Sequence, residues 1–183
     1  RSLLGGGLMS RLATMAMVMD RCAALGIRFV VLDRPNPIGG VEVEGNLPLP
    51  GMQSFVSHLP LANRHGMTAG EVARLYAHAA RLDLDLAIVP CRGWTRGAAW
   101  TDTGLPFVPP SPNIPAVETA LVYPGMCLLE GTNVSEGRGT TTPFLVFGAP
   151  FVEDPWALAD ALRALDLPGV TWRPTFFRPD KDK

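Results

Sequence analysis

Residues 27–32, with the sequence IRFVVL, decide the fold that this chain is predicted to adopt. β-branched and apolar side chains fill the run, which is typical of a strand buried on both faces of a parallel sheet. A second run of this kind, LDLAIV, occupies residues 84–89. Between the two runs, Thr68 and Glu71 form a capping box that begins a helix extending to about Leu82. A strand, a helix and a second strand in this order predict a βαβ unit with parallel strands.

The segments on either side of this unit extend the α/β pattern. Residues 8–25 carry apolar side chains at three- and four-residue steps, which predicts an amphipathic helix that ends at Gly26. Those side chains are Leu8, Leu12, Met15, Met19 and Cys22. Asp154 and Pro155 are typical of a helix start, and residues 170–177 are predicted to form a strand. We expect one α/β domain over residues 1–183, with a mostly parallel sheet, helices on both of its faces, and both chain ends truncated.

Composition excludes several classes of protein. The chain has 183 residues, of which 47% are hydrophobic and 18% are charged, so it is too apolar for a disordered protein. A net charge of −1 excludes a nucleic-acid partner held mainly by a basic surface. No apolar run is long and uncharged enough to predict a membrane span. The three cysteines form no CxxC pair and the three histidines have no ligand-like spacing, so we predict neither a metal site nor a cofactor.

The loops that follow the two predicted strands are the first candidate site. Ligands of open parallel sheets bind beyond the carboxyl ends of the strands, where both loops are expected to lie. Asp33, Arg34 and Asn36 follow the first strand among prolines that hold the backbone rigid. Their side chains either contact a ligand or brace the loop. In the second loop, Trp94 and Trp100 either stack on a flat ligand such as a sugar ring or form the core of the loop itself.

Two further polar segments allow alternative interpretations. Arg64 and His65 precede the capped helix, whose N-terminal amides attract anions, so a substrate carboxylate or phosphate is one expected ligand there. The alternative is a surface histidine beside a helix cap. Asn113 either binds sugar hydroxyls or serves as a helix cap.

Residues 130–141, EGTNVSEGRGTT, carry the densest polar chemistry of the chain. Glu130 and Glu136 provide the two carboxylates that glycosidases commonly use, with Asn133 and Arg138 in the same segment. In an extended chain the two carboxylates would lie about 20 Å apart, so they form a pair only if the segment folds back. The glycines within it allow this. We favour a functional role over a solvated loop.

Four motifs together are similar to one protein family. They are residues 32–37 (LDRPNP), 64–68 (RHGMT), 110–115 (PSPNIP) and 130–140 (EGTNVSEGRGT). In this order they resemble the bacterial NamZ-type exo-β-N-acetylmuramidases, over almost the whole chain. The resemblance implies a glycosidase of cell-wall recycling that releases N-acetylmuramic acid from the non-reducing end of peptidoglycan fragments. It also implies a Rossmann-like core that is part of a larger two-subdomain enzyme, in which the C-terminal subdomain begins near or after residue 170.

The resemblance also suggests roles for individual side chains. Either Glu130 or Glu136 acts as general acid or stabilising carboxylate, while the other holds substrate or orients Arg138. The lactyl carboxylate of the muramic sugar binds Arg64 and His65, or Arg138. The remaining expected substrate-binding residues are Asp33, Arg34, Asn36, Glu44, Trp94, Trp100, Asn113 and Asn133.

Members of the family are about twice as long as this chain, and Met126 stands where they usually have a small polar residue. The expected partners are muramyl saccharides derived from peptidoglycan, and the expected location of the full-length protein is secreted or periplasmic. A non-catalytic module that binds muramyl glycans is the alternative function. A dinucleotide or nucleotide-sugar enzyme is disfavoured because the turn after Leu32 lacks the glycine-rich sequence that such enzymes need.

Overall fold

The computed structural model describes residues 9–52 and 54–180 and divides the chain into two compact units. The first unit comprises Arg1–Gly125 and the second Met126–Lys183. This division differs from the single domain over residues 1–183 that the sequence predicts. It also differs from a subdomain boundary near residue 170. Each unit is described by itself.

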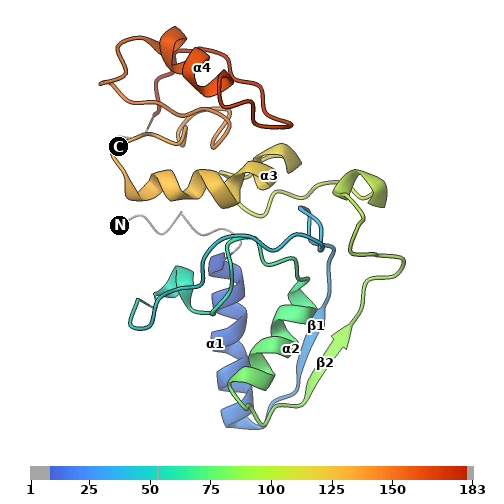
Figure 1. Ribbon diagram of the computed structural model, residues 1–183. Helices are drawn as coiled ribbons and strands as arrows, with labels where there is room; N and C mark the ends of the chain where they lie inside the picture. Colours follow the sequence, from blue (N-terminus) through green and yellow to red (C-terminus); the bar gives the residue numbers. More distant parts are fainter. Residues whose placement is uncertain (1–8, 53, 181–183) are drawn as a thin grey trace. The chain divides into compact units, whose positions relative to one another are not determined.

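A βαβ unit with a preceding helix forms the core of the first unit. Strands β1 (Phe29–Leu32) and β2 (Leu86–Val89) pair in parallel, with Leu32 opposite Val89. Helix α2 (Ala69–Ala79) connects them, as the hydrophobic pattern predicts, and helix α1 (Met9–Leu25) precedes them. The predicted first position of that helix, Leu8, lies outside the described residues. Figure 1 shows α1 and α2 side by side and next to the two strands.

Both helices pack on the same face of this small sheet. Met19 of α1, Ala73 of α2 and Val31 of β1 are buried in one cluster. The opposite face carries Val30 and Leu32, and Leu32 is 73% exposed. The predictions of strands buried on both faces and of helices on both faces are therefore wrong for the residues that the structure describes. Alternate side chains of a strand point to opposite faces, and only one face here has helices against it.

The N-terminus of α2 contacts the end of β1 directly. Thr68 caps the helix, and its hydroxyl accepts a hydrogen bond from the Glu71 amide while Glu71 binds the Thr68 amide, which confirms the predicted capping box. A methyl group at Gly70 would lie 2.7 Å from the Ile88 side chain and 2.8 Å from the Asp33 carboxyl carbon. Glycine at this position therefore lets the helix approach both strands.

The second unit contains helix α4 (Pro155–Arg163), whose N-terminus is capped by Asp154 as predicted. Residues 170–177 form no strand, so that prediction is wrong. Their aromatic side chains instead pack on neighbouring segments, with Trp172 edge-on to Phe147 and Phe176 tilted against Trp156. Pro174 interrupts this run, and within the described part of the second unit no strand is available to pair with it.

Helix α3 (Val117–Met126) was not predicted, because Pro124 and Gly125 near its end are typical of a turn. Its N-terminal part belongs to the first unit, where Ala120 packs with Ile38 and Ile114. The loop after β1, the loop after β2 and α3 are thereby brought together.

We predict that Gly70→Ala destabilises the protein even though alanine is the better helix former. Overpacking at a tight contact costs about 1–3 kcal/mol, whereas helix propensity returns at most about 1 kcal/mol. Gly125→Ala is the matched control, because no atom lies within 4 Å of a methyl group built there. Urea unfolding should show a lower midpoint for Gly70→Ala and an unchanged or higher midpoint for Gly125→Ala. Equal midpoints for the two variants would contradict the close contact.

Candidate functional site

Asp33 connects the end of β1 to the start of α2. Its Oδ2 accepts a hydrogen bond of 2.7 Å from the Thr68 hydroxyl, and its Oδ1 accepts bonds from the amides of Gly70 (2.8 Å) and Arg34 (2.9 Å). Both carboxylate oxygens are thus used within the protein. This geometry agrees with the interpretation that Asp33 braces the loop. It does not agree with the interpretation that Asp33 contacts a ligand.

The same contacts change the expected role of the helix N-terminus. The amides of Thr68, Gly70 and Glu71 already bind the side chains of Glu71, Asp33 and Thr68, respectively. A substrate anion would have to displace one of these partners, so the predicted anion site at the start of α2 is not supported. The carboxylate that the helix dipole attracts comes from Asp33 of the chain itself.

His65 is buried rather than exposed, so the interpretation of it as a surface histidine is wrong. Its Nδ1 accepts a hydrogen bond of 3.1 Å from the Met67 amide, which places the proton of the neutral ring on Nε2. Within residues 9–52 and 54–180, Nε2 is buried and has no hydrogen-bond partner. Burial lowers the pKa of His65 from its usual value of 6.5, with the nearby Glu71 carboxylate opposing this effect. His65 is therefore a neutral hydrogen-bond donor and not a cation.

Asn36 also braces the loops. Its amide nitrogen donates to the Met67 carbonyl at 3.0 Å, and its amide oxygen accepts from the Ile38 amide at 3.1 Å. The side chain of Asn36 is buried, whereas Arg34 is exposed. Asn36 thus holds the loop after β1 against the segment that leads into α2.

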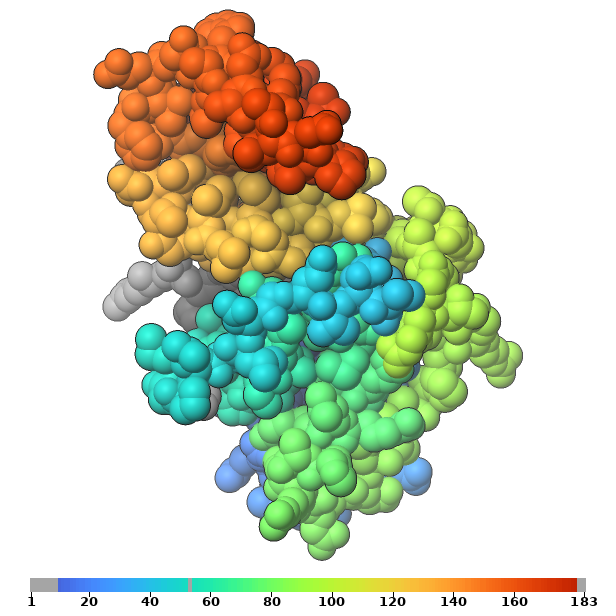
Figure 2. Space-filling view, viewed as in Figure 1, coloured from blue at the N-terminus to red at the C-terminus, as the bar shows by residue number. Residues whose placement is uncertain are grey.

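Arg96, which sequence reasoning missed, joins three segments, namely the loop after β1, the loop after β2 and the segment that leads into α2. These three segments together are called the rim. Its Nη1 donates to the carbonyls of Gly66 (3.0 Å) and Gly40 (3.3 Å), and its Nη2 pairs with Glu71. The Gly40 amide in turn donates to the Arg96 carbonyl at 2.9 Å. Figure 2 shows the blue segment around residue 40 against the yellow-green segment after β2. No local pattern marks this arginine, because its partners, two backbone carbonyls and the Glu71 carboxylate, are far away in the sequence.

The two candidate tryptophans lie in different surroundings. The Arg96 guanidinium carbon lies 5.9 Å from the centre of the Trp94 ring, and a methyl group at Gly40 would be 3.1 Å from the tip of that ring. Trp94 is thus packed into the loop, as the alternative interpretation predicted. Trp100 packs edge-on against Phe107, with ring centres 5.7 Å apart, and lines an open hollow.

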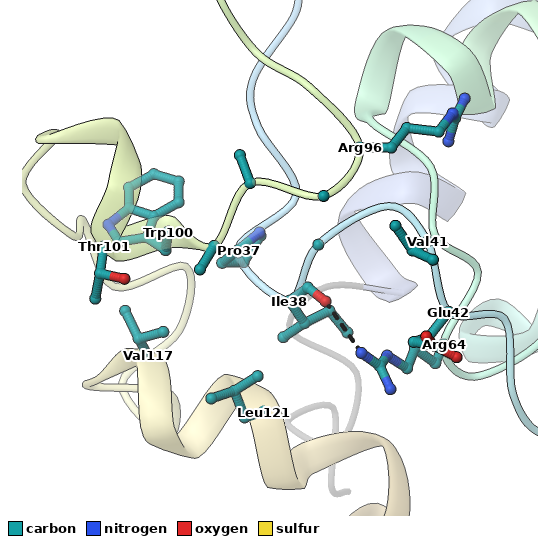
Figure 3. Close-up of a pocket in the computed structure, with 14 residues that line it drawn as sticks. Pro37, Ile38, Val41, Glu42, Arg64, Arg96, Trp100, Thr101, Val117 and Leu121 are labelled. Carbon is teal, nitrogen blue, oxygen red and sulfur yellow. Dashed lines mark hydrogen bonds between the residues drawn. The ribbon is translucent and has the colours of Figure 1, made fainter.

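The hollow has a volume of about 270 Å³ and lies between the loop after β1, the loop after β2 and α3. Figure 3 shows Trp100 and Thr101 on one side, Val117 and Leu121 of α3 below, and Arg64 on the other side. Arg64 Nη1 forms an ion pair with Glu44 at 2.7 Å. Asn113 lies in the turn between Ser111 and Ile114 rather than at a helix cap, and it does not line this hollow.

The second unit brings Glu130, Glu136 and Arg138 together, so the segment folds back as a pair of carboxylates requires. Arg138 Nη2 lies 2.5 Å from Glu130, and Nε of the same guanidinium lies 3.2 Å from Glu136. The Glu136 side chain is only 1% exposed, whereas that of Glu130 is 24% exposed. Asn133 is exposed in the loop between the two glutamates.

The ring of Phe144 packs against the guanidinium of this cluster. The Arg138 guanidinium carbon lies 5.3 Å from the centre of its ring, and the Phe144 amide donates to the Glu136 carbonyl at 2.7 Å. Phe144 has a φ of 63°, a conformation that bulky residues rarely adopt and that often occurs near functional sites. A methyl group at Gly137 would lie 2.6 Å from the Val146 side chain, so the turn between Glu136 and Arg138 requires glycine.

The structure thus places the predicted residues in two groups. The first unit holds Asp33, Arg34, Asn36, Glu44, Arg64, His65, Trp94, Trp100 and Asn113, and the second holds Glu130, Asn133, Glu136 and Arg138. In the part of the chain that is described, no three His, Cys, Asp or Glu side chains are arranged to hold a metal ion. None of the described helices is long and apolar enough to cross a membrane.

Two family models match the chain. The model described as "Exo-beta-N-acetylmuramidase NamZ, N-terminal" covers residues 9–118, and that described as "Exo-beta-N-acetylmuramidase NamZ, C-terminal" covers residues 121–183. Peptidoglycan beta-N-acetylmuramidase NamZ of Bacillus subtilis strain 168 is 49% identical over 170 residues, which are 93% of this chain and 41% of the relative. The chain therefore spans less than half of that relative.

Two crystal structures of DUF1343 family proteins from Bacteroides fragilis are also similar. One has a TM-score of 0.88 at 38% identity and covers 96% of this chain and 46% of its own. The other has a TM-score of 0.71 at 39% identity, with 78% of this chain and 40% of its own covered. Both similarities extend over far more than the βαβ unit.

We predict that His65 makes stability depend on pH. Its pKa is lowered in the folded protein, so as the pH falls below about 6.5 the unfolded chain takes up the proton first. The stability that the neutral ring contributes is thus present above pH 6.5 and is lost as the pH falls towards the lowered value. In His65→Asn, the side-chain oxygen can still accept the Met67 amide but does not titrate. Urea midpoints at pH 7.5 and 5.5 should differ less for this variant than for wild type, and an equal loss would contradict the prediction.

Proposed function

This chain belongs to the exo-beta-N-acetylmuramidase NamZ family, and we propose that the intact protein is a glycoside hydrolase that releases N-acetylmuramic acid from the non-reducing end of peptidoglycan fragments. The name of the Bacillus subtilis relative, at 49% identity, supports this activity. In this account the partners are muramyl saccharides and the protein works outside the cytoplasm, secreted or periplasmic.

One observation carries the proposal, namely that a single guanidinium contacts two carboxylates in the second unit. As ionised groups, Glu130, Glu136 and Arg138 sum to one net negative charge. Glycosidases pass through a transition state that resembles a positively charged oxocarbenium ion. A fixed, partly buried negative charge stabilises such a state more than it does the ground-state sugar ring, which carries no positive charge.

Exposure assigns different roles to the two glutamates. Glu130 is the carboxylate that can reach a sugar, because a quarter of its side chain is exposed. Glu136 is buried and holds Arg138, which in turn holds Glu130. We therefore assign Glu130 the catalytic role, as stabilising carboxylate or general acid, and Glu136 a positioning role.

We propose that the part of the enzyme outside this chain covers the exposed face of the sheet and completes the fold. The uncovered sheet face with Val30, Leu32 and Val89, together with the 41% coverage of the relative, supports a larger Rossmann-like core. Helices of the rest of the enzyme that pack on this face would bury these apolar side chains, which folded enzymes rarely expose as a group. In this account the chain is part of a two-subdomain enzyme.

The test is the release of a chromophore from a β-linked N-acetylmuramic acid substrate by the intact protein, with the N-acetylglucosamine analogue as substrate control. Glu130→Gln should lower kcat/KM by about 10²-fold or more, which is the usual loss for a group that acts on the reacting bond. Glu136→Gln should also lower the rate, and Glu136→Asp should recover part of it because the charge on Arg138 is again balanced. Glu153→Gln, an exposed carboxylate of the same unit, should have no effect.

Near-normal turnover by Glu130→Gln would remove Glu130 from the mechanism. Binding of muramyl sugars by the intact protein without release of product would instead support the non-catalytic binding module.

A further inference from the structure

The hollow of the first unit has two chemically different sides. Ile38, Val117 and Leu121 give it an apolar wall, and the Arg64 side chain lies opposite (Figure 3). Its volume of about 270 Å³ is slightly below that of pockets that enclose a whole small molecule, for which about 300 Å³ is the usual lower limit. The hollow therefore fits a substituent with an apolar part and a negative charge better than it fits a complete sugar.

Arg64 is held in place by its backbone. The amide of Arg64 donates to the Glu44 carbonyl at 3.0 Å, and the amide of Glu44 donates to the Arg64 carbonyl at 2.9 Å. The Arg64 Nη2 reaches the Ile38 carbonyl at 3.4 Å, which is the dashed contact in Figure 3. The backbone bonds fix the main chain of Arg64, and the Ile38 contact holds its guanidinium beside the hollow without using a carboxylate.

The carboxylate that now pairs with Arg64 is easily exchanged. The Glu44 side chain is 64% exposed, against 26% for Arg64. An ion pair with one solvent-exposed partner contributes little to stability, so replacing Glu44 by another carboxylate costs little. A ligand carboxylate that arrives with an apolar group against Ile38 and Leu121 would gain contacts that Glu44 does not make.

The other cationic candidates are less suited to bind a substrate carboxylate. Arg138 already lies between Glu130 and Glu136. Arg96 is bound to two backbone carbonyls and to Glu71, and these bonds hold the rim together. His65 is a buried, neutral ring whose Nδ1 accepts a hydrogen bond from the Met67 amide, so it offers no positive charge to a carboxylate.

We propose that Arg64 exchanges Glu44 for the lactyl carboxylate of a muramic acid residue, and that the lactyl methyl group packs against Ile38 and Leu121. This inference rests on the proposed function and identifies the part of the chain that distinguishes muramic acid from glucosamine. The lactyl ether consists of a carboxylate on a methyl-bearing carbon, and N-acetylglucosamine lacks it. The hollow thereby becomes a specificity site, with Glu44 as a stand-in for the substrate carboxylate.

The charge around the hollow leads to an unusual expectation for Glu44. Glu42 lines the hollow and Glu44 pairs with Arg64, so two carboxylates lie near Arg64 before a ligand binds. Removing the Glu44 charge leaves Arg64 without its competing partner. Binding of a carboxylate ligand should therefore become stronger in Glu44→Gln, although Glu44 pairs with the arginine that would bind the ligand.

The experiment measures equilibrium binding of N-acetylmuramic acid and of N-acetylglucosamine to the intact protein by calorimetry. Arg64→Gln should weaken binding of N-acetylmuramic acid by about 10-fold or more, the loss expected for a charge-assisted hydrogen bond, and leave N-acetylglucosamine binding unchanged. Glu44→Gln should strengthen binding of N-acetylmuramic acid several-fold. The control is the exposed Arg28–Asp85 pair at the other end of the strands, so Arg28→Gln and Asp85→Asn should change neither affinity.

Three results would overturn the inference. They are unchanged binding of N-acetylmuramic acid by Arg64→Gln, an equal loss for both sugars, and no binding of N-acetylmuramic acid by the wild type. If Arg64→Gln does not fold, weaker binding by Glu44→Gln overturns it as well. Failure of the proposed function is distinguishable, because it would appear as absence of chromophore release while Arg64 still controls binding.

Discussion

The carboxylate of Asp33 is the interaction on which the rest of the first unit depends. It follows the last residue of β1 and binds the Thr68 hydroxyl and the Gly70 amide at the start of α2. A negative charge at this position also stabilises the helix through its dipole. Because Gly70 has no side chain, α2 can approach the strands closely enough for these bonds to form. One side chain thus fixes the direction of the helix relative to the sheet.

The candidate binding surface is built outward from this contact. With α2 fixed, Glu71 is placed to bind Arg96, and Arg96 holds the carbonyls of Gly40 and Gly66. These bonds bring the loop after β1 against the loop after β2, and the hollow beside Arg64 lies between them. In the second unit Arg138 has a comparable role, because it pairs with two carboxylates while its guanidinium lies over the ring of Phe144. In both units an arginine organises a loop that has little secondary structure.

Local patterns in the sequence predicted those features that depend on residues close to one another in the chain. The βαβ order and the Thr68 capping box are confirmed, and the segment from Glu130 to Glu136 folds back as its glycines allow. The uncovered sheet face and the burial of His65 were not predicted, and the sequence could not decide between bracing and ligand contact for Asp33 and Asn36, because each outcome depends on partners distant in the sequence. Arg96 was missed for the same reason. The choice of substrate residues therefore needed the three-dimensional contacts, whereas the family was recognisable from its motifs.

Hydrogen exchange of Asp33→Asn tests most directly whether this carboxylate organises the rim. The asparagine amide can still accept the Gly70 bond on its oxygen, but its nitrogen cannot accept the Thr68 hydroxyl. We expect amides of residues 36–40 and 64–67 to exchange at least about 10-fold faster together with the first turn of α2. Asp154→Asn, which alters the cap of α4, should affect that helix alone. Faster exchange confined to α2 in Asp33→Asn, with both loops unchanged, would contradict the account.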